Sequence, residues 1–137
     1  MSFPAVVIYE GRNMEENVLL VDDEEEFVEA FAERLRLRGF VAHVAYNGEQ
    51  ALQKIREGVA RIMVLDLKMP GIDGLEVLRR IKKAQPEVQV IILSGHGSEK
   101  DEEIARNFGA CEYLRKPADI CAVLEALTRA KNNLKNG

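Results

Sequence analysis

The chain has 137 residues, the size of one domain that buries roughly two thirds of the surface exposed by its unfolded form. Hydrophobic residues make up 47% and charged residues 31%, and the net charge of −4, from 19 Lys and Arg against 23 Asp and Glu, argues against a nucleic-acid partner. No apolar run approaches the ~20 residues that cross a bilayer and no signal-peptide pattern is present, so we expect a cytoplasmic protein that binds no membrane.

Residues 1–15 fit none of the elements that follow, because Phe3-Pro4 and Gly11 interrupt any regular pattern. We expect a loose N-terminal extension here, in which the apolar run over residues 5–9 sticks to a sheet edge. The domain itself is expected over residues 16–132, followed by a flexible C-terminal tail over 133–137.

Five apolar runs predict strands over residues 18–21, 41–45, 62–65, 88–93 and 113–114, and a helical pattern follows each of them. Five such alternations favour a parallel sheet with right-handed crossovers and helices on both faces. Capping residues predict where three of the helices begin. They are Asn47 with Gln50, Asp73 with Glu76, and Ser98 with Asp101.

Polar side chains follow four of the five predicted strands. Asp22 and Asp23 come after the first strand, Asp66 after the third, Ser94 after the fourth and Lys116 after the fifth. We expect these side chains to lie together, because the carboxyl ends of parallel strands meet at one edge, where such sheets bind ligands. Three carboxylates at one point repel one another, and a hard divalent cation, best Mg²⁺, relieves that repulsion.

The same residue types suit phosphoryl chemistry. A lysine and a hydroxyl beside Mg²⁺ stabilise the charge on the oxygens of a phosphoryl group, and one carboxylate oxygen can attack phosphorus to give an aspartyl phosphate. Neighbouring acids have structural interpretations instead. Glu24, Glu25 and Glu26 complement the dipole of the helix that they open, and Asp73 is a helix cap.

Four segments, in this order and at these strand ends, make the sequence similar to the response-regulator receiver domain of two-component signalling. The similarity extends from about Asn17 to Ala130. It implies a flavodoxin-like, doubly wound α/β fold with five parallel strands and five helices, (βα)5. The segments are Leu20-Val21-Asp22-Asp23, Val64-Leu65-Asp66-Leu67-Lys68-Met69-Pro70-Gly71, Ser94-Gly95-His96-Gly97 and Tyr113-Leu114-Arg115-Lys116-Pro117.

The resemblance implies a metal site and a phosphorylation site. Asp66 would be the phosphoacceptor and a ligand of Mg²⁺. Asp23 would bind the ion directly, Asp22 mainly through water, and the backbone carbonyl of Lys68 would be a further ligand.

The resemblance also implies a switch. Lys116 would contact the phosphoryl oxygens, and the Lys116-Pro117 peptide bond would be cis. Ser94 would move its hydroxyl onto the phosphoryl group, and Tyr113 would turn inward as it does so. Lys68 and His96 would stand where the family varies the lifetime of the phosphoryl group.

The implied partners are a sensor histidine kinase or phosphotransfer protein as donor, and an unidentified downstream protein as target. A phosphorylation-dependent homodimer is a further expectation. The protein would be a signalling phosphoacceptor, which assists its own phosphorylation and dephosphorylation, and no enzyme in the usual sense.

Three other functions can be weighed against this one. FMN binding needs a loop rich in glycine and hydroxyls after the first strand, where this chain has five acids over residues 22–26. A phosphatase of the haloacid-dehalogenase type needs a second acid two residues after its nucleophile, where this chain has Lys68. A receiver-fold interaction module that works without phosphorylation stays open, and a phosphorylation assay distinguishes it.

Overall fold

The computed structural model describes residues 16–136. Its single sheet is parallel throughout, with the strand order β2-β1-β3-β4-β5, which is the order of flavodoxin-like doubly wound folds and confirms the predicted fold class. The strands are β1 (Asn17–Val21), β2 (Val41–Ala45), β3 (Ile62–Leu65), β4 (Gln89–Ser94) and β5 (Glu112–Arg115). The helices are α2 (Glu25–Arg36), α3 (Gly48–Arg56), α4 (Gly74–Ala84), α5 (Glu99–Asn107) and α6 (Ile120–Asn136).

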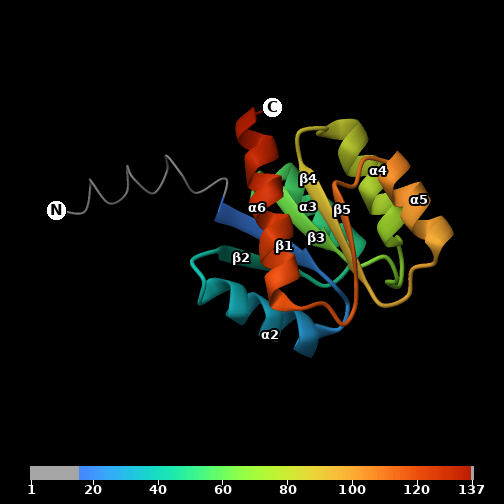
Figure 1. Cartoon of the computed structure of the whole chain (residues 1–137). Coiled ribbons are helices and arrows are strands. Elements are labelled where there is room, and N and C mark those ends of the chain that lie inside the picture. The colour runs from blue at the N-terminus through green and yellow to red at the C-terminus, as the bar shows by residue number, and fades with distance from the viewer. Residues whose placement is uncertain (1–15, 137) are drawn as a thin grey trace.

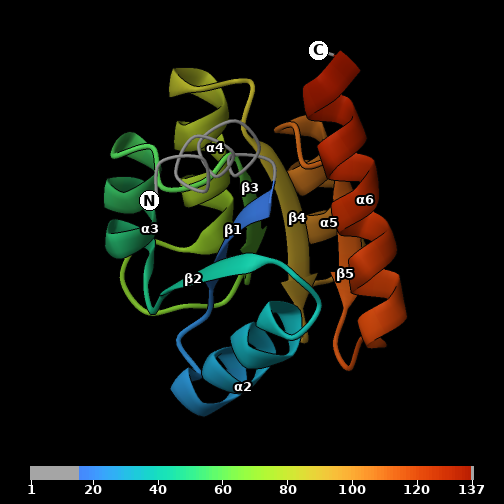
Figure 2. The same ribbon diagram turned by 90° about the vertical axis from the view of Figure 1, so that its left-hand side faces the viewer.

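Helices cover both faces of the sheet (Figures 1 and 2). Side chains alternate along β1, so that Leu19 and Val21 join one core with α3, α4 and α5, while Val18 and Leu20 join the other with α2 and α6. Every residue of β1 and β3 is buried. Burial on both faces explains why these two strands are continuous apolar runs in the sequence.

The chain turns sharply after β3, and Gly74 makes this turn possible. A methyl group on Gly74 would overlap the carbonyl oxygen of Asp66 and come 2.6 Å from Leu67 Cα. The Gly74 N–H donates to the Leu67 carbonyl at 2.9 Å. The start of α4 is therefore packed directly against the backbone that carries Asp66.

The predicted helix starts are present, with one difference. Asn47, Asp73 and Ser98 each accept a hydrogen bond from a backbone N–H three residues on. A reciprocal capping box forms at Ser98 and Asp101 alone among the helices of residues 16–136. At α4 the carboxylate of Glu76 instead pairs with two arginines of the next turn.

The C-terminus differs from the flexible tail predicted over residues 133–137, because α6 continues to Asn136. Leu134 packs against the core shared with α2, and Asn133 Nδ2 donates to Gln89 Oε1 at 2.9 Å, so this turn has tertiary contacts. The extension predicted over residues 1–15 lies outside the described residues. Within 16–136, no helix combines the length and apolar character that a membrane span requires.

Candidate functional site

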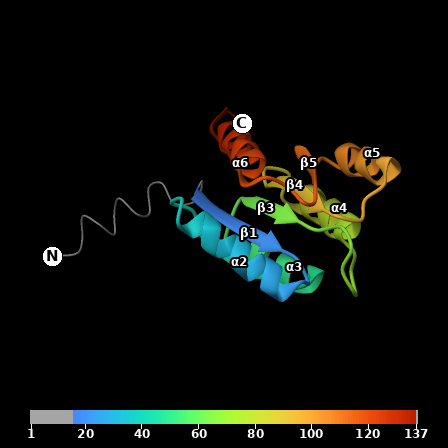
Figure 3. The same ribbon diagram turned by 60° about the horizontal axis from the view of Figure 1, so that its bottom comes forward.

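Three carboxylates converge at the carboxyl ends of β1 and β3. Asp22, Asp23 and Asp66 each place an oxygen within 4.8 Å of the others. The arrowheads of β1 and β3 point the same way in Figure 3, so the loops that follow them lie at one sheet edge. Asp22 and Asp66 are buried and Asp23 is exposed, which leaves the cluster open to solvent on one side.

Asp66 is the most deeply buried of the three acids. Its side chain is 3% exposed, and its Oδ1 has no hydrogen-bond partner among the described residues. Its Oδ2 lies 4.0 Å from Lys116 Nζ, which is beyond hydrogen-bond distance. Since a buried polar atom without a partner is uncommon in native proteins, this oxygen is free to bind a ligand or to react.

Lys116 makes its hydrogen bonds elsewhere at this edge. Its Nζ donates to Asp22 Oδ2 at 2.6 Å and to Glu24 Oε1 at 3.2 Å, and it lies 4.3 Å from the centre of the Phe27 ring. The Lys116-Pro117 peptide bond is cis, as the family resemblance implies.

The acids keep Lys116 charged. Burial by itself lowers the pKa of Lys116, but the hydrogen bond to Asp22 and the charges of Asp22 and Asp66 outweigh it and raise the pKa above its usual value. Burial raises the pKa of Asp22, against the opposing effect of the Lys116 hydrogen bond. One ammonium group therefore compensates the three converging carboxylates only in part.

The donor set fits a hard divalent cation. Carboxylate oxygens are the ligands that Mg²⁺ prefers, and one of these oxygens, Asp66 Oδ1, is buried with no partner in residues 16–136. A cation here would also relieve the repulsion among Asp22, Asp23 and Asp66. The carbonyl of Lys68 as a further ligand stays a prediction.

Ser94 ends β4, the strand that pairs with β3, so the structure brings it to the same edge. The side chain is buried, and its Oγ accepts a hydrogen bond from the backbone N–H of His96 at 3.3 Å. A hydroxyl in this place can also donate its own hydrogen to a ligand oxygen.

The ring of Tyr113 points inward in this structure. Tyr113 is 8% exposed, its hydroxyl has no partner within residues 16–136, and burial raises its pKa. Gly97 leaves the space that this ring fills. The coupling of this inward position to a phosphoryl group on Asp66 stays a prediction.

Two residues of this edge were not singled out from the sequence. Glu24 was interpreted as a helix-dipole acid, yet it contacts Lys116. Arg115 joins the loop after β4 to α5, because it donates to the Gly97 carbonyl at 2.6 Å and to Glu102 at 3.2 Å. The position of Glu24 directly after Asp22 and Asp23 was the signal that could have identified it.

Comparison with known proteins agrees with this geometry. A model of the response regulator receiver domain family matches residues 18–128. A transcriptional regulatory protein of Haemophilus influenzae, a CpxR homolog, is 36% identical over 126 residues, which cover 87% of this chain and 55% of that protein. The curated relatives are longer, and the chain spans 24% to 55% of the length of those it matches.

Solved structures show the same fold. The CheY-like receiver domain protein of Methanospirillum hungatei has a TM-score of 0.84 at 25% identity, with coverage of 89% of this chain and 98% of that one. The response regulator TrrA of Thermotoga maritima, solved in complex with Mg²⁺-BeF, has a TM-score of 0.77 at 32% identity, with coverage of 84% and 98%.

Proposed function

Because the chain belongs to the response regulator receiver domain family, we propose that Asp66 accepts a phosphoryl group in a Mg²⁺-dependent reaction and that the phosphorylated form changes a protein-interaction surface. The observation that carries the proposal is the buried Asp66 carboxylate, which lies beside two further acids and a lysine and has one oxygen without a partner in the described part of the chain. A structural aspartate in this position would have its oxygens hydrogen-bonded.

The reaction assigns a role to each side chain. One Asp66 oxygen attacks phosphorus, and the bond from phosphorus to the donor's nitrogen or oxygen breaks, with its electron pair leaving on the donor. Lys116 is held 4.0 Å from Asp66 Oδ2 and is close enough to reach a phosphoryl oxygen after a small movement. Ser94 Oγ would donate to another phosphoryl oxygen in place of accepting from His96.

Mg²⁺ would be held by Asp22, Asp23 and Asp66, with the Lys68 carbonyl as a further ligand, and would neutralise negative charge on the phosphoryl oxygens. Asp22 faces both the metal position and Lys116, and therefore holds the lysine at the edge of the site. TrrA, which shares 32% identity, was solved with Mg²⁺ and BeF, a group that imitates a phosphoryl group.

The proposed donor is a sensor histidine kinase or a phosphotransfer protein, and the proposed target is a downstream protein or a second copy of the chain. The curated relatives include transcriptional regulators that are longer than this chain. Their DNA-directed activity belongs to whole proteins, and the receiver domain is proposed here as the part that receives the signal.

Phosphorylation with a small donor tests the proposal. The protein with acetyl phosphate and Mg²⁺ should gain one base-labile phosphoryl group by intact-protein mass spectrometry, and Asp66→Asn should remove it. Asp73→Asn is the matched control, because Asp73 is an exposed helix cap seven residues along the same chain segment. A base-stable adduct on Ser94 contradicts the proposal. The absence of any adduct also contradicts it and favours the phosphorylation-independent interaction module.

A further inference from the structure

The ammonium group of Lys116 has three carboxylates within reach, and it lies closest to the two that do not react. Asp22 Oδ2 is 2.6 Å away, Glu24 Oε1 is 3.2 Å away and Asp66 Oδ2 is 4.0 Å away. The proposed reaction needs this ammonium on a phosphoryl group attached to Asp66. Two of the three N–H groups of Lys116 are engaged by Asp22 and Glu24, so a movement of the lysine toward that phosphoryl group would weaken one of these contacts.

The contact with Asp22 is the more costly one to break, because Asp22 is buried beside the lysine and faces the same metal position. Glu24 is different, since its side chain is 65% exposed and its carboxylate can return to water at little cost. Of the two hydrogen bonds that Lys116 makes among residues 16–136, the bond to Glu24 is also the longer.

The backbone around Glu24 holds its side chain in reach of Lys116. Asp22 Oδ1 accepts a hydrogen bond from the Glu24 N–H at 2.9 Å, and Glu24 stands at the N-cap position of α2 without capping the helix through its own side chain. Phe27, on the first turn of the same helix, places its ring 4.3 Å from Lys116 Nζ. Glu24 and Phe27, both at the N-terminal end of α2, therefore flank the ammonium group of Lys116.

We propose that Glu24 is a positioning residue that competes with the phosphoryl group for Lys116 and so lowers the occupancy of the phosphorylated form. This inference rests on the proposed function of Asp66. In the unphosphorylated protein Glu24 holds the lysine short of Asp66, and in the phosphorylated protein it has to release the lysine beside an added negative charge. Both effects oppose phosphorylation.

The competition should be modest and sensitive to salt. An exposed ion pair of this kind changes an equilibrium by roughly two- to fivefold, and charges at a solvent-facing site are screened over about 10 Å at 0.1 M salt. Glu24→Gln should therefore tighten the binding of a phosphoryl analogue by about that factor at low salt, and the gain should shrink at high salt.

The probe is beryllofluoride, formed from beryllium chloride and sodium fluoride in the presence of Mg²⁺, and titrated against the full chain while amide shifts are followed. Glu24→Gln should bind it more tightly than wild type. Glu24→Asp keeps the charge but is one methylene shorter, so it should lose the contact and also bind more tightly than wild type. Glu26→Gln removes the same charge two residues further along the chain. Within residues 16–136 Glu26 is not among the carboxylates that contact Lys116, so this variant should leave the affinity for beryllofluoride unchanged.

The results separate this inference from the proposed function. Wild-type protein that shows no saturable, Mg²⁺-dependent response to beryllofluoride contradicts the proposed function itself. If wild type responds and Glu24→Gln binds with equal affinity, the competition at Lys116 is wrong while the proposed function stands. The proposed competition is also contradicted if Glu24→Asp binds beryllofluoride with the affinity of wild type. The same holds if Glu26→Gln raises that affinity as much as Glu24→Gln does, because then only the net charge of the protein matters.

Discussion

The hydroxyl group of Tyr113 occupies the space that a side chain at position 97 would fill. A methyl group on Gly97 would overlap the hydroxyl oxygen and come 2.9 Å from Tyr113 Cζ. Gly97 lies in the loop after β4 and Tyr113 lies on β5. The inward position of the Tyr113 ring therefore depends on the absence of a side chain at Gly97.

We expect Gly97→Ala to destabilise the protein by about 1–3 kcal/mol, because the ring has to leave its buried position or strain the loop around it. Urea unfolding measures the change. In a Tyr113→Ala background the overlap is gone, and the same substitution should have little effect. Equal destabilisation in both backgrounds would show that Gly97 is needed for its backbone and not for the room it gives to Tyr113.

The three converging acids should destabilise the metal-free protein. Asp23→Asn removes one charge of the cluster, and we expect it to raise stability without Mg²⁺ by up to about 1 kcal/mol. In millimolar Mg²⁺ wild type should instead be more stable than Asp23→Asn, because wild type gains stability from binding the ion and the variant gains little. Thermal unfolding with and without Mg²⁺ gives both values, with Glu26→Gln as a control outside the cluster. An equal Mg²⁺ response in Asp23→Asn argues against this site.

Glu76 gives a pH-dependent prediction away from the site. Hydrogen bonds from Arg79 and Arg80, both at 2.7 Å, lower the pKa of Glu76 from 4.5 to about 2. A lowered pKa contributes stability that is complete above pH 4.5 and is lost as the pH falls toward 2. Glu76→Gln should therefore be less stable than wild type at pH 7, with a difference that shrinks below pH 4.5.

The matched control for this prediction is Glu49→Gln. Glu49 also lies in the first turn of a helix, so it shares the interaction with the helix dipole but has no described arginine partner. Urea unfolding at several pH values should show a larger pH-dependent difference for the Glu76 variant. Matching curves for the two variants would mean that the dipole, and not the arginine pairs, accounts for the effect.

Much of the fold was predictable because its central strands are buried on both faces. Burial of β1 and β3 requires continuous apolar runs, and such runs locate the strand ends where Asp22 and Asp66 stand. The gathering of the acids with Lys116 follows from the parallel topology alone. The last turn of α6 was not predictable in the same way, because its tertiary contacts include the packing of Leu134 and a hydrogen bond from Asn133 to the distant Gln89, which the local sequence pattern does not reveal.

The arrangement within the site could not be derived from the sequence. Which carboxylate Lys116 contacts depends on differences of about 1 Å among side chains from different loops, and sequence patterns do not resolve these. The inward ring of Tyr113 depends on the loop backbone at Gly97, which the sequence shows only as a glycine. Strand ends place residues at an edge, and tertiary packing decides their partners.

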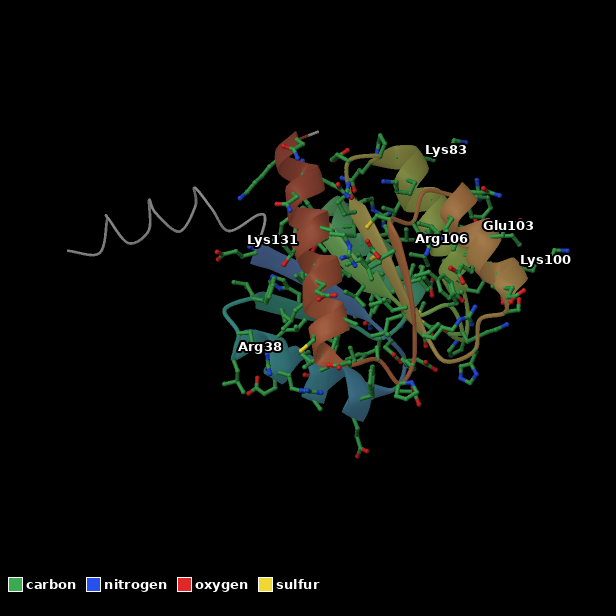
Figure 4. The ribbon with its side chains drawn as sticks, in the orientation of Figure 1. Arg38, Lys83, Lys100, Glu103, Arg106 and Lys131 are labelled. Atoms are coloured by element: carbon green, nitrogen blue, oxygen red, sulfur yellow. The ribbon has the colours of Figure 1, made fainter. Side chains whose placement is uncertain are left out.

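A continuous set of contacts leads from Ser94 to α5. Ser94 Oγ accepts from the His96 N–H, and one residue on the Gly97 carbonyl accepts from Arg115, which also pairs with Glu102 on α5. The helix is weakly held, since Ala105 is its one buried residue. Figure 4 shows its Lys100 and Glu103 side chains directed away from the sheet.

We expect a phosphoryl analogue on Asp66 to move α5 through Arg115. If Ser94 turns its hydroxyl to the analogue, the His96 N–H loses its partner, and the loop that carries the Gly97 carbonyl has to shift. Beryllofluoride with Mg²⁺ should then change amide shifts from the Asp66 loop through residues 94–116, with a coupling of typically about 1–3 kcal/mol between the two sites.

Arg115→Ala should confine the changes to the loops around Asp66 and Ser94. Arg106→Ala is the control, because Arg106 also pairs with Glu102 but does not contact the loop, and it should leave the pattern intact. Changes that reach α5 equally in Arg115→Ala would show that the signal travels by another route.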